Sequence, residues 1–430
     1  MPSVVRGLTV PLDSPLPASL LGALKDYRRL VNELVREAIT TGKTARGSLS
    51  RFARDRAFAL ELTGQHAVVA AEVALSLAKG HRRRLRLSRP SSVPYLLRPF
   101  LQADRSTFHL DPGSGKVRLS LRNGVWCSFH LRIAPYHRAV LASPGVRVKQ
   151  LHVSPSGVAL FVERPAPEPF RPESLIALDT NESSLDGVAI EPKLQQLVTV
   201  PFPEVRTVQG RHVGRRRRLA RKKATDRRVG RMLLGREGRR EHNRVTSRLH
   251  VLSRQLVDTA RAHRAAIALE DLTRLPLPRR RGRRLRPRGA PRSPGLRRRL
   301  SSWPRRELHR QIAYKAEERG VPVYWVNPFR TSVTCPRCGD IQRRSRVGPV
   351  FDCPSCHWRM DRQLNAGVNI GQTVLRDYGR VELAGLRLDL DALFEEARKP
   401  RYPFEKSDGH GPSGGRGRDS FGPPETPGLG

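Results

Sequence analysis

The spacing of apolar residues divides the chain into a helical block, a β-rich block and a longer mixed block. Residues 3–11 alternate as in a strand, and residues 18–41 carry apolar side chains at the repeat of an α-helix. A second helical stretch begins near residue 48, and a third covers about residues 66–79. Between about 94 and 164 the pattern changes to short runs rich in β-branched and aromatic residues. The N-terminal part therefore predicts strands with a helical insertion.

The β-rich block contains five runs of strand-like composition. They cover residues 106–110, 116–121, 125–133, 146–153 and 157–163. Short strands at this spacing are typical of a small barrel or sandwich, and we expect the strand at 3–11 to join it across the helices. Cys127 lies in one of these runs, where a lone cysteine is expected to be a small buried apolar residue.

The proline-rich stretch 165–172, PAPEPFRP, predicts a stiff linker and a domain boundary. After it, runs within 173–190 and at 197–200 follow in immediate succession and predict an antiparallel meander of three strands. Basic helices, a short buried strand ending at Glu270, a helix after Ser302 and the strand VPVYWV come next. This order is that of an RNase H-like fold, in which helices flank a mixed sheet. We therefore expect an α/β multidomain protein.

Two Cys-x-x-Cys pairs follow the last predicted strand. Cys335 with Cys338, and Cys353 with Cys356, have the spacing at which two tight turns direct four thiolates at one tetrahedral zinc ion. The alternatives are disulfides or an accidental cluster, and a reducing compartment favours metal over disulfide. The sequence thus predicts a structural zinc ribbon at 331–360.

Three carboxylates are candidates for a metal-binding catalytic site. Asp179 and Glu270 each end an apolar strand, and Asp361 follows the second cysteine pair. Taken alone, such a residue is equally well explained as a turn or cap residue. In an RNase H-like fold, however, they would meet at one sheet edge, where without a cation they would repel one another. Carboxylates suit Mg²⁺, and two ions about 4 Å apart can activate water and stabilise the leaving oxygen of a phosphodiester.

Asp361, Asn365 and Asn369 recur at every fourth position, which places them on one face of a helix. The two asparagines either make capping or packing hydrogen bonds or support the ligands of a metal ion, and the sequence leaves both interpretations open. His250 lies among the basic helices, where we expect it at the surface or against a phosphate rather than in catalysis.

The balance of charge indicates the class of partner. The chain has 81 Lys and Arg against 39 Asp and Glu, so its formal net charge is +42. Self-repulsion of this size is most simply explained if a polyanion neutralises it. Residues 205–250 predict long basic helices, for which a merely solvated face is the alternative. The segment 279–299 is rich in Arg and lacks acids, and we expect it to be a phosphate-binding loop or lid.

The sequence has no apolar run of membrane-spanning length and no apolar signal-peptide region at its start. We therefore expect a soluble, cytoplasmic protein without a membrane partner. Residues 396–430 are rich in Gly, Pro and Ser and predict a disordered tail.

Five strings carry a resemblance to a known family: IALDTNESSLDGVAI, IALEDLTRL, TCPRCGD, CPSC and DRQLNAGVNI, in this order within about 173–375. They resemble the RuvC-type nuclease domain of the TnpB family, the OrfB-type proteins of insertion sequences, which is similar to compact type V CRISPR effectors. The resemblance implies a RuvC-like domain at 173–330 and 361–395 that contains the zinc ribbon. Over residues 1–172 the resemblance rests only on the order of the predicted strands and helices. It implies a wedge-like β-barrel module at 1–11 and 91–172 and a helical recognition insertion at 12–90.

The resemblance further implies a transposon-encoded, RNA-guided DNA endonuclease. Its partners would be a guide RNA from the transposon end and double-stranded target DNA beside a short motif, and the protein would associate with the prokaryotic nucleoid when bound. It assigns the catalytic, magnesium-binding acids to Asp179, Glu270 and Asp361. It assigns the zinc ligands to the four cysteines named above. The alternatives are a catalytically silent RNA-guided repressor, a transposition accessory protein, and a basic zinc-ribbon RNA chaperone without a guide.

The sequence departs from the family pattern at three positions. Asn181 and His357 stand where Gly is common, and Gly367 stands where Ala is usual. No proposed ligand is affected. Gly367 costs roughly 1 kcal/mol of helix propensity relative to Ala, which predicts a looser final helix.

Overall fold

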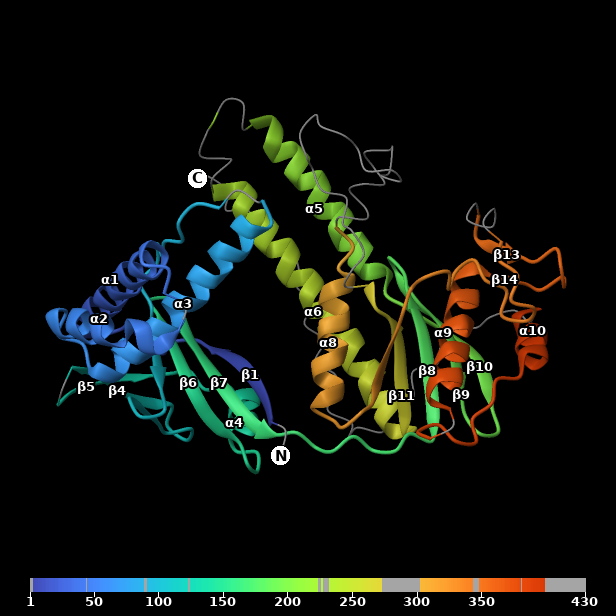
Figure 1. The fold of residues 1–430 in the computed structure, drawn as a ribbon, viewed down its shortest axis with the longest axis horizontal. Coiled ribbons are helices and arrows are strands. Elements are labelled where there is room, and N and C mark those ends of the chain that lie inside the picture. The colour runs from blue at the N-terminus through green and yellow to red at the C-terminus, as the bar shows by residue number, and fades with distance from the viewer. Residues whose placement is uncertain are drawn as a thin grey trace, which may run out of the picture. The chain divides into compact units, whose positions relative to one another are not determined.

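The computed structural model describes residues 3–43, 45–88, 91–122, 124–222, 226, 232–272, 302–342, 348–379 and 381–398. The chain divides into two compact units (Figure 1). The first is Met1–Pro169 with Glu317–Gly320, and the second is Phe170–Ala316 with Val321–Gly430. The Arg-rich segment 279–299 and residues 399–430 of the expected tail lie outside the described residues.

Three helices form the helical part of the first unit. They are α1 (Ala18–Thr40), α2 (Arg46–Ala59) and α3 (Gly64–Arg86). Helix α1 buries one stripe, which includes Leu20, Leu24 and Tyr27, because apolar residues three or four apart share a face. Helix α3 continues beyond the expected end at residue 79, and its last turn carries the basic side chains Arg83, Arg84 and Arg86.

Two antiparallel sheets complete the first unit. One has the order β1-β7-β6-β2 and the other β3-β4-β5. Their strands are β1 (Ser3–Val10), β2 (Leu101–Asp104), β3 (Phe108–Leu110), β4 (Lys116–Arg122), β5 (Val125–His130), β6 (Arg147–Ser154) and β7 (Gly157–Pro165). Strand β1 pairs with β7, which confirms that the first strand joins the sheet across the helices. Strand β2 and the short helix α4 (Pro135–Leu141) were not expected. Both sheets and the three helices contribute to one apolar core, in which Cys127 is buried.

The second unit is built on one five-stranded mixed sheet of order β10-β9-β8-β11-β12. Its strands are β8 (Ser174–Thr180), β9 (Ser184–Ile190), β10 (Gln195–Pro201), β11 (Ala265–Glu270) and β12 (Val323–Val326). Strands β8, β9 and β10 form the predicted antiparallel meander, whereas β11 lies parallel to both β8 and β12. Strand β8 alternates between two cores: Leu175 and Ala177 enter one, Ile176 and Leu178 the other.

Helices cover both faces of this sheet (Figure 1). The helices α5 (Pro203–Lys222), α6 (Leu234–Ala262) and α8 (Arg305–Glu317) pack on the core of Ile176 and Leu178. The helices α9 (Arg362–Tyr378) and α10 (Leu390–Arg398) pack on the other core. Residues 396–398 thus complete a helix and do not belong to a tail, since Leu393 at the buried face holds α10 in place. Among the described residues, no helix is both long and apolar enough to cross a membrane.

Helix α9 approaches the sheet closely at Gly367. A Cβ atom built on Gly367 would lie 2.7 Å from the carbonyl oxygen of Asp186 and would also collide with the backbone of Gly187. Helix α9 is continuous through Gly367, and close packing explains why a glycine stands there. The glycine sacrifices helix propensity, but it lets the helix backbone lie directly on β9.

Candidate functional site

Asp179 and Glu270 lie side by side at the end of the mixed sheet. Leu178 of β8 is aligned with Leu269 of β11 in the parallel register, and each acid is the next residue along its strand. Successive side chains of a strand alternate between faces, so Asp179 points to the same face as Ala177, the face that α9 covers. Glu270 shares that face because Ala268 packs in the same core.

The two carboxyl groups are electrostatically strained in the absence of a cation. Burial raises the pKa of Asp179 well above its ordinary value, and the charges of Glu270 and Asp186 raise it further. Burial also raises the pKa of Glu270, and a hydrogen bond from the Thr331 hydroxyl lowers it in part. Neighbouring acids whose pKa values are raised by burial, and for Asp179 also by nearby charges, are typical of a functional site, and a bound cation would stabilise their charged forms.

Asp186 is a third buried acid that the sequence reasoning missed. It is the cross-strand partner of Asp179 on β9 and faces α9, since Val188 and Ile190 of the same strand pack in that core. Its carboxylate accepts hydrogen bonds from the Asn181 side chain at 2.8 Å and from the Ser184 hydroxyl at 2.5 Å. The signal was the meander itself, because a tight connection after Asp179 places an acid seven positions later beside it.

Asp361 is placed differently from Asp179 and Glu270. It ends strand β14 (Arg359–Asp361), is exposed, and caps helix α9: its carboxylate accepts the backbone N–H groups of Gln363 at 2.8 Å and Leu364 at 3.3 Å. The parallel register brings Asp179 and Glu270 together, and the hydrogen bonds of Asp361 are those of a helix cap. A catalytic role for Asp361 stays a prediction.

Asn365 and Asn369 fasten α9 to the loop that precedes the first cysteine. Asn365 is fully buried; it accepts the indole N–H of Trp358 at 3.0 Å and donates to the carbonyl oxygen of Thr334 at 3.0 Å. Asn369 donates to the carbonyl oxygens of Thr331 and Thr334, each at 2.8 Å. These are packing hydrogen bonds. They also connect Asn369 through Thr331 to Glu270, so the loop that holds Glu270 is itself held by α9.

The four cysteines form a compact group around the short hairpin of β13 (Val350–Asp352) and β14. Within the described parts of the chain they are the one group of three or more metal-binding side chains whose ligand atoms all lie within 4.8 Å of one another. The Sγ atoms of Cys335 and Cys356 are 3.5 Å apart, as are those of Cys338 and Cys353. Zn–S bonds of about 2.3 Å in a tetrahedron put sulfur atoms about 3.8 Å apart, so the group could hold a structural zinc ion.

The thiol pKa values fit such a site. Burial raises the pKa of Cys335 and Cys356, whereas the pKa of Cys338 is lowered, chiefly by a backbone hydrogen bond from Asp340. All four cysteines are free of disulfide bonds. Because zinc binds thiolates, the ion would displace protons that burial otherwise keeps on the sulfur atoms.

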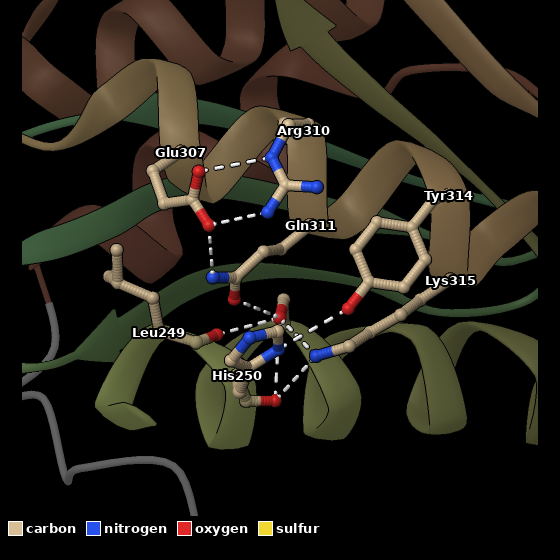
Figure 2. Close-up of polar contacts among 8 residues, drawn as sticks. Leu249, His250, Glu307, Arg310, Gln311, Tyr314 and Lys315 are labelled. Carbon is tan, nitrogen blue, oxygen red and sulfur yellow. Dashed lines mark hydrogen bonds and ion pairs between the residues drawn. The ribbon is translucent and has the colours of Figure 1, made fainter. Parts of the chain in front are cut away.

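Helix α8 is fixed against α6 by a polar network (Figure 2). The ammonium group of Lys315 donates to the carbonyl oxygen of His250 and to the hydroxyl of Ser253, each at 2.6 Å. Gln311 accepts from Ser253 at 3.2 Å, and it donates to Glu307 at 2.7 Å. Lys315 and Gln311 are both buried, so this network sets the position of α8 along α6.

The network also assigns a place to His250. Its Nδ1 atom lies 3.2 Å from the hydroxyl of Tyr314, so the partly exposed ring packs at the α6–α8 contact, and the expected phosphate contact stays a prediction. From the same helix α8, His309 reaches the Thr180 hydroxyl at 2.8 Å, directly beside Asp179. Burial, helped by the charge of Arg305, lowers the pKa of His309 to about 4, so this ring is neutral at pH 7.

Part of this unit matches a known family of domains. The family model described as "Cas12f1-like, TNB domain" matches residues 306–370. The matched segment contains most of α8, strand β12, the four cysteines and the first half of α9.

The curated relatives match over short stretches. The chain is 33% identical over 135 residues to the TnpB-like protein MJ0751 of Methanocaldococcus jannaschii, which is 30% of this chain and 43% of that protein. It is 38% identical over 72 residues to the CRISPR-associated endodeoxyribonuclease Cas12f1 of Sulfoacidibacillus thermotolerans, which is 16% of this chain and 17% of that protein. The chain thus spans less than half the length of these relatives.

Solved structures match over most of the chain. A chain of the Cas12f1–sgRNA–target DNA complex superposes with a TM-score of 0.59 and 13% identity, covering 86% of this chain and 98% of that one. The mini-RNA-guided endonuclease CRISPR-Cas_phi3 superposes with a TM-score of 0.54 and 11% identity, covering 87% and 92%. At this identity the likeness establishes the fold, a mixed α/β fold of the kind found in these compact effectors. Together with the family model and the TnpB-like relatives, it supports a TnpB-family protein and confirms the resemblance of the sequence motifs.

Proposed function

We propose that this protein is a transposon-encoded, RNA-guided DNA endonuclease that hydrolyses phosphodiesters at one RuvC-type site. The observation that carries the proposal is the pair of carboxyl groups of half-buried Asp179 and buried Glu270 on neighbouring parallel strands. The sheet order β10-β9-β8-β11-β12, an antiparallel meander followed by two parallel strands, supports an RNase H-like nuclease domain. Its likeness to Cas12f1, an endodeoxyribonuclease, supports the reaction class.

Asp179 and Glu270 would hold Mg²⁺. Burial raises the pKa of both acids, so they fit a hard divalent cation that takes oxygen ligands. When bound, one or two such ions activate the attacking water and stabilise the leaving oxygen. The protein itself contributes the hydrogen bond from Thr331, which orients Glu270.

Two residues are candidates for the third carboxylate of this site. The family resemblance assigns it to Asp361, whose carboxylate is engaged by the amides of α9. The geometry favours Asp186 instead, because it is paired with Asp179 across the strands and acts on its pKa. Replacing each acid by its amide separates the two assignments, since an amide preserves size and the capping hydrogen bond but removes the charge.

Nucleic acid is the proposed partner. A net charge of +42 suits a polyanion, and the structural neighbour is a complex with a guide RNA and target DNA. We propose a guide RNA transcribed from the transposon end, which would read the target by base pairing beside a short duplex motif. The cysteine group would hold a structural Zn²⁺ that fixes the loop of Thr331 and Thr334 against α9.

A second candidate is a catalytically silent member of the family, an RNA-guided DNA-binding repressor or a transposition accessory protein. The capping hydrogen bonds of Asp361 favour it in one respect: both amides bind Oδ1, so this oxygen is occupied by the helix and would not serve as a ligand of a two-ion centre. Such a protein would bind the same RNA, DNA and zinc but would not hydrolyse DNA.

A plasmid-interference assay tests the two candidates. Cells would express the chain with its adjacent noncoding transcript and carry a target flanked by a randomised library. The nuclease predicts loss of particular flanking sequences with the natural chain, and no loss with Asp179→Ala although that variant still copurifies with the RNA. The silent candidate predicts repression of a reporter at the target without plasmid loss, equal for the natural chain and the variant.

A further inference from the structure

A cavity of about 340 Å³ lies in the second unit, at the same end of the sheet as Asp179. One wall is a face of α5, and another is Glu182 in the connection between β8 and β9. Ser302 and Trp303, just ahead of α8, close the third side. The carboxylates point to the α9 face, so this cavity is separate from them.

The face of α5 that lines the cavity is shaped to leave room. Gly210, Val213 and Gly214 recur at helical spacing, and a Cβ atom added to either glycine would meet nothing within 4 Å. The two glycines thus leave an open groove where other residues would place side chains. A groove of this kind admits a flat group close to the helix backbone.

Two arginines frame the groove. Arg206 and Arg217 both line the cavity from α5, and they are eleven positions apart, about 16 Å along the helix axis. Both side chains are exposed. Neither makes an ion pair with a carboxylate in the described part of the chain. Two guanidinium groups at this separation are suited to different phosphates of one extended strand.

Trp303 presents an aromatic ring in a fixed position. Its indole N–H donates to the carbonyl oxygen of Asn181 at 2.8 Å, and the guanidinium of Arg305 lies 4.9 Å from the ring centroid. The ring is half-buried and lines the cavity. A fixed aromatic ring between flanking arginines is the arrangement with which proteins bind single strands, where unpaired bases expose their faces for stacking. A duplex would hide those faces.

We propose that this cavity binds a short single-stranded segment of nucleic acid, with one base against Trp303 and the neighbouring phosphates on Arg206 and Arg217. Glu182 would accept a hydrogen bond from a base amino group. Asn181, whose carbonyl oxygen accepts the indole N–H of Trp303, is two residues beyond Asp179, so the cavity lies at the end of the strand that carries Asp179 but on the other face of the sheet. The proposal that the cavity binds a single strand rests on the proposed function in one respect only: whether that strand is target DNA or guide RNA.

Binding of short oligonucleotides to the full chain tests the proposal. Labelled single-stranded DNA and RNA of equal length would be titrated by fluorescence anisotropy over a range of salt concentrations, with chelator present and with Asp179→Asn in every protein so that no strand is cut. Arg206→Gln and Arg217→Gln remove the proposed contacts. Arg211→Gln is the matched control, because it removes the same charge from the same helix but does not line the cavity.

The pocket predicts a clear difference between these variants. Arg206→Gln should lower the slope of log affinity against log salt by about 0.7, the value for one phosphate contact on a single strand, while Arg211→Gln leaves it unchanged. Trp303→Leu should weaken binding roughly tenfold, and Gly210→Leu, which fills the groove, should weaken it as well. A strand that carries 5-iodouracil should crosslink to Trp303. Tighter binding of DNA assigns the target strand to the cavity, and tighter binding of RNA assigns the guide.

Equal effects of Arg206→Gln and Arg211→Gln, or crosslinks that all map outside Trp303 and α5, would overturn the proposal. These readouts need no cleavage. A chain that binds in this way but never cuts therefore contradicts the proposed nuclease and leaves the pocket intact, and a chain that cuts without these contacts does the reverse.

Discussion

Asp179 and Glu270 occupy equivalent positions on two neighbouring parallel strands, each one residue beyond the aligned pair of Leu178 and Leu269. Burial raises the pKa of both carboxyl groups, and the charges of Glu270 and Asp186 raise the pKa of Asp179 further. The sheet thus concentrates negative charge at one end.

Asp179→Asn should stabilise the cation-free protein. The amide removes a carboxyl group whose pKa is raised and which is therefore costly to ionise, so we expect the free energy of unfolding at pH 7 to rise. Mg²⁺ should then raise the melting temperature of the natural chain but not that of the variant. Calorimetry with and without Mg²⁺ measures both. An equal response of the two proteins to Mg²⁺ would remove Asp179 from the metal site.

Asp361→Asn and Asp361→Ala separate the cap from the ligand. Asn caps helices about as well as Asp, so the Asn variant should keep its stability, whereas Ala should cost about 1 kcal/mol. If Asp361 acts only as a cap, Asp361→Asn also keeps its cleavage rate, and Asp186→Asn is the variant that loses it. Loss of cleavage in Asp361→Asn with unchanged stability would restore Asp361 as the third catalytic acid.

Gly367→Ala should destabilise the protein although alanine is the better helix former. The added methyl group collides with the backbone of Gly187, which we expect to cost roughly 1–3 kcal/mol in urea unfolding. Gly238→Ala in α6 is the matched control, because its Cβ would meet nothing within 4 Å, and it should gain up to about 1 kcal/mol. A stabilised Gly367→Ala variant would show that α9 does not lie against β9 as described.

His66 should make the first unit sensitive to acid. It is fully buried in α3, and burial lowers its pKa from 6.5 to about 4. Between these values the unfolded chain binds a proton that the folded chain does not, so stability rises with pH across this window and falls on acidification. From pH 7 to pH 5 the loss is about 2 kcal/mol. His66→Leu should lack this part of the loss, and His130→Gln, an exposed control, should retain it.

Cys335→Ser should remove the zinc and loosen the loop that supports Glu270. We expect about one zinc ion per natural chain by elemental analysis and none for the variant. Because Thr331 and Thr334 are held by asparagines of α9 beside the cysteine group, a chelator should lower the melting temperature of the natural chain. Cys127→Ala, which lies in another core, should keep the zinc. Full zinc occupancy in Cys335→Ser would contradict the four-cysteine site.

The sequence was sufficient for features encoded by local pattern. The meander, the strand that ends at Glu270, the cysteine group and the joining of β1 to β7 all depend on periodicity or fixed spacing. The sequence was insufficient where the role of a residue depends on a contact with another helix or strand. Asp186 gains its importance from the register of β9 against β8, and Gly367 from the depth at which α9 lies on the sheet.

Asp361 is a residue whose role could not be decided from its position in the sequence. Its position just after the second cysteine pair fits a catalytic acid and a helix cap equally well, and the hydrogen bonds to Gln363 and Leu364 establish only the cap. The cavity beside Trp303 has no sequence signature, because its walls come from α5, from the connection after β8 and from the chain ahead of α8.

Cleavage of a guide-matched plasmid by the purified protein–RNA complex tests the central claim most directly. With Mg²⁺ present, the natural chain should convert supercoiled plasmid to cut forms, and Asp179→Asn and Glu270→Gln complexes with the same RNA content should leave it supercoiled. If either variant cuts at the natural rate, or if chelation of Mg²⁺ leaves cleavage unchanged, the paired carboxylates are not the site of the reaction.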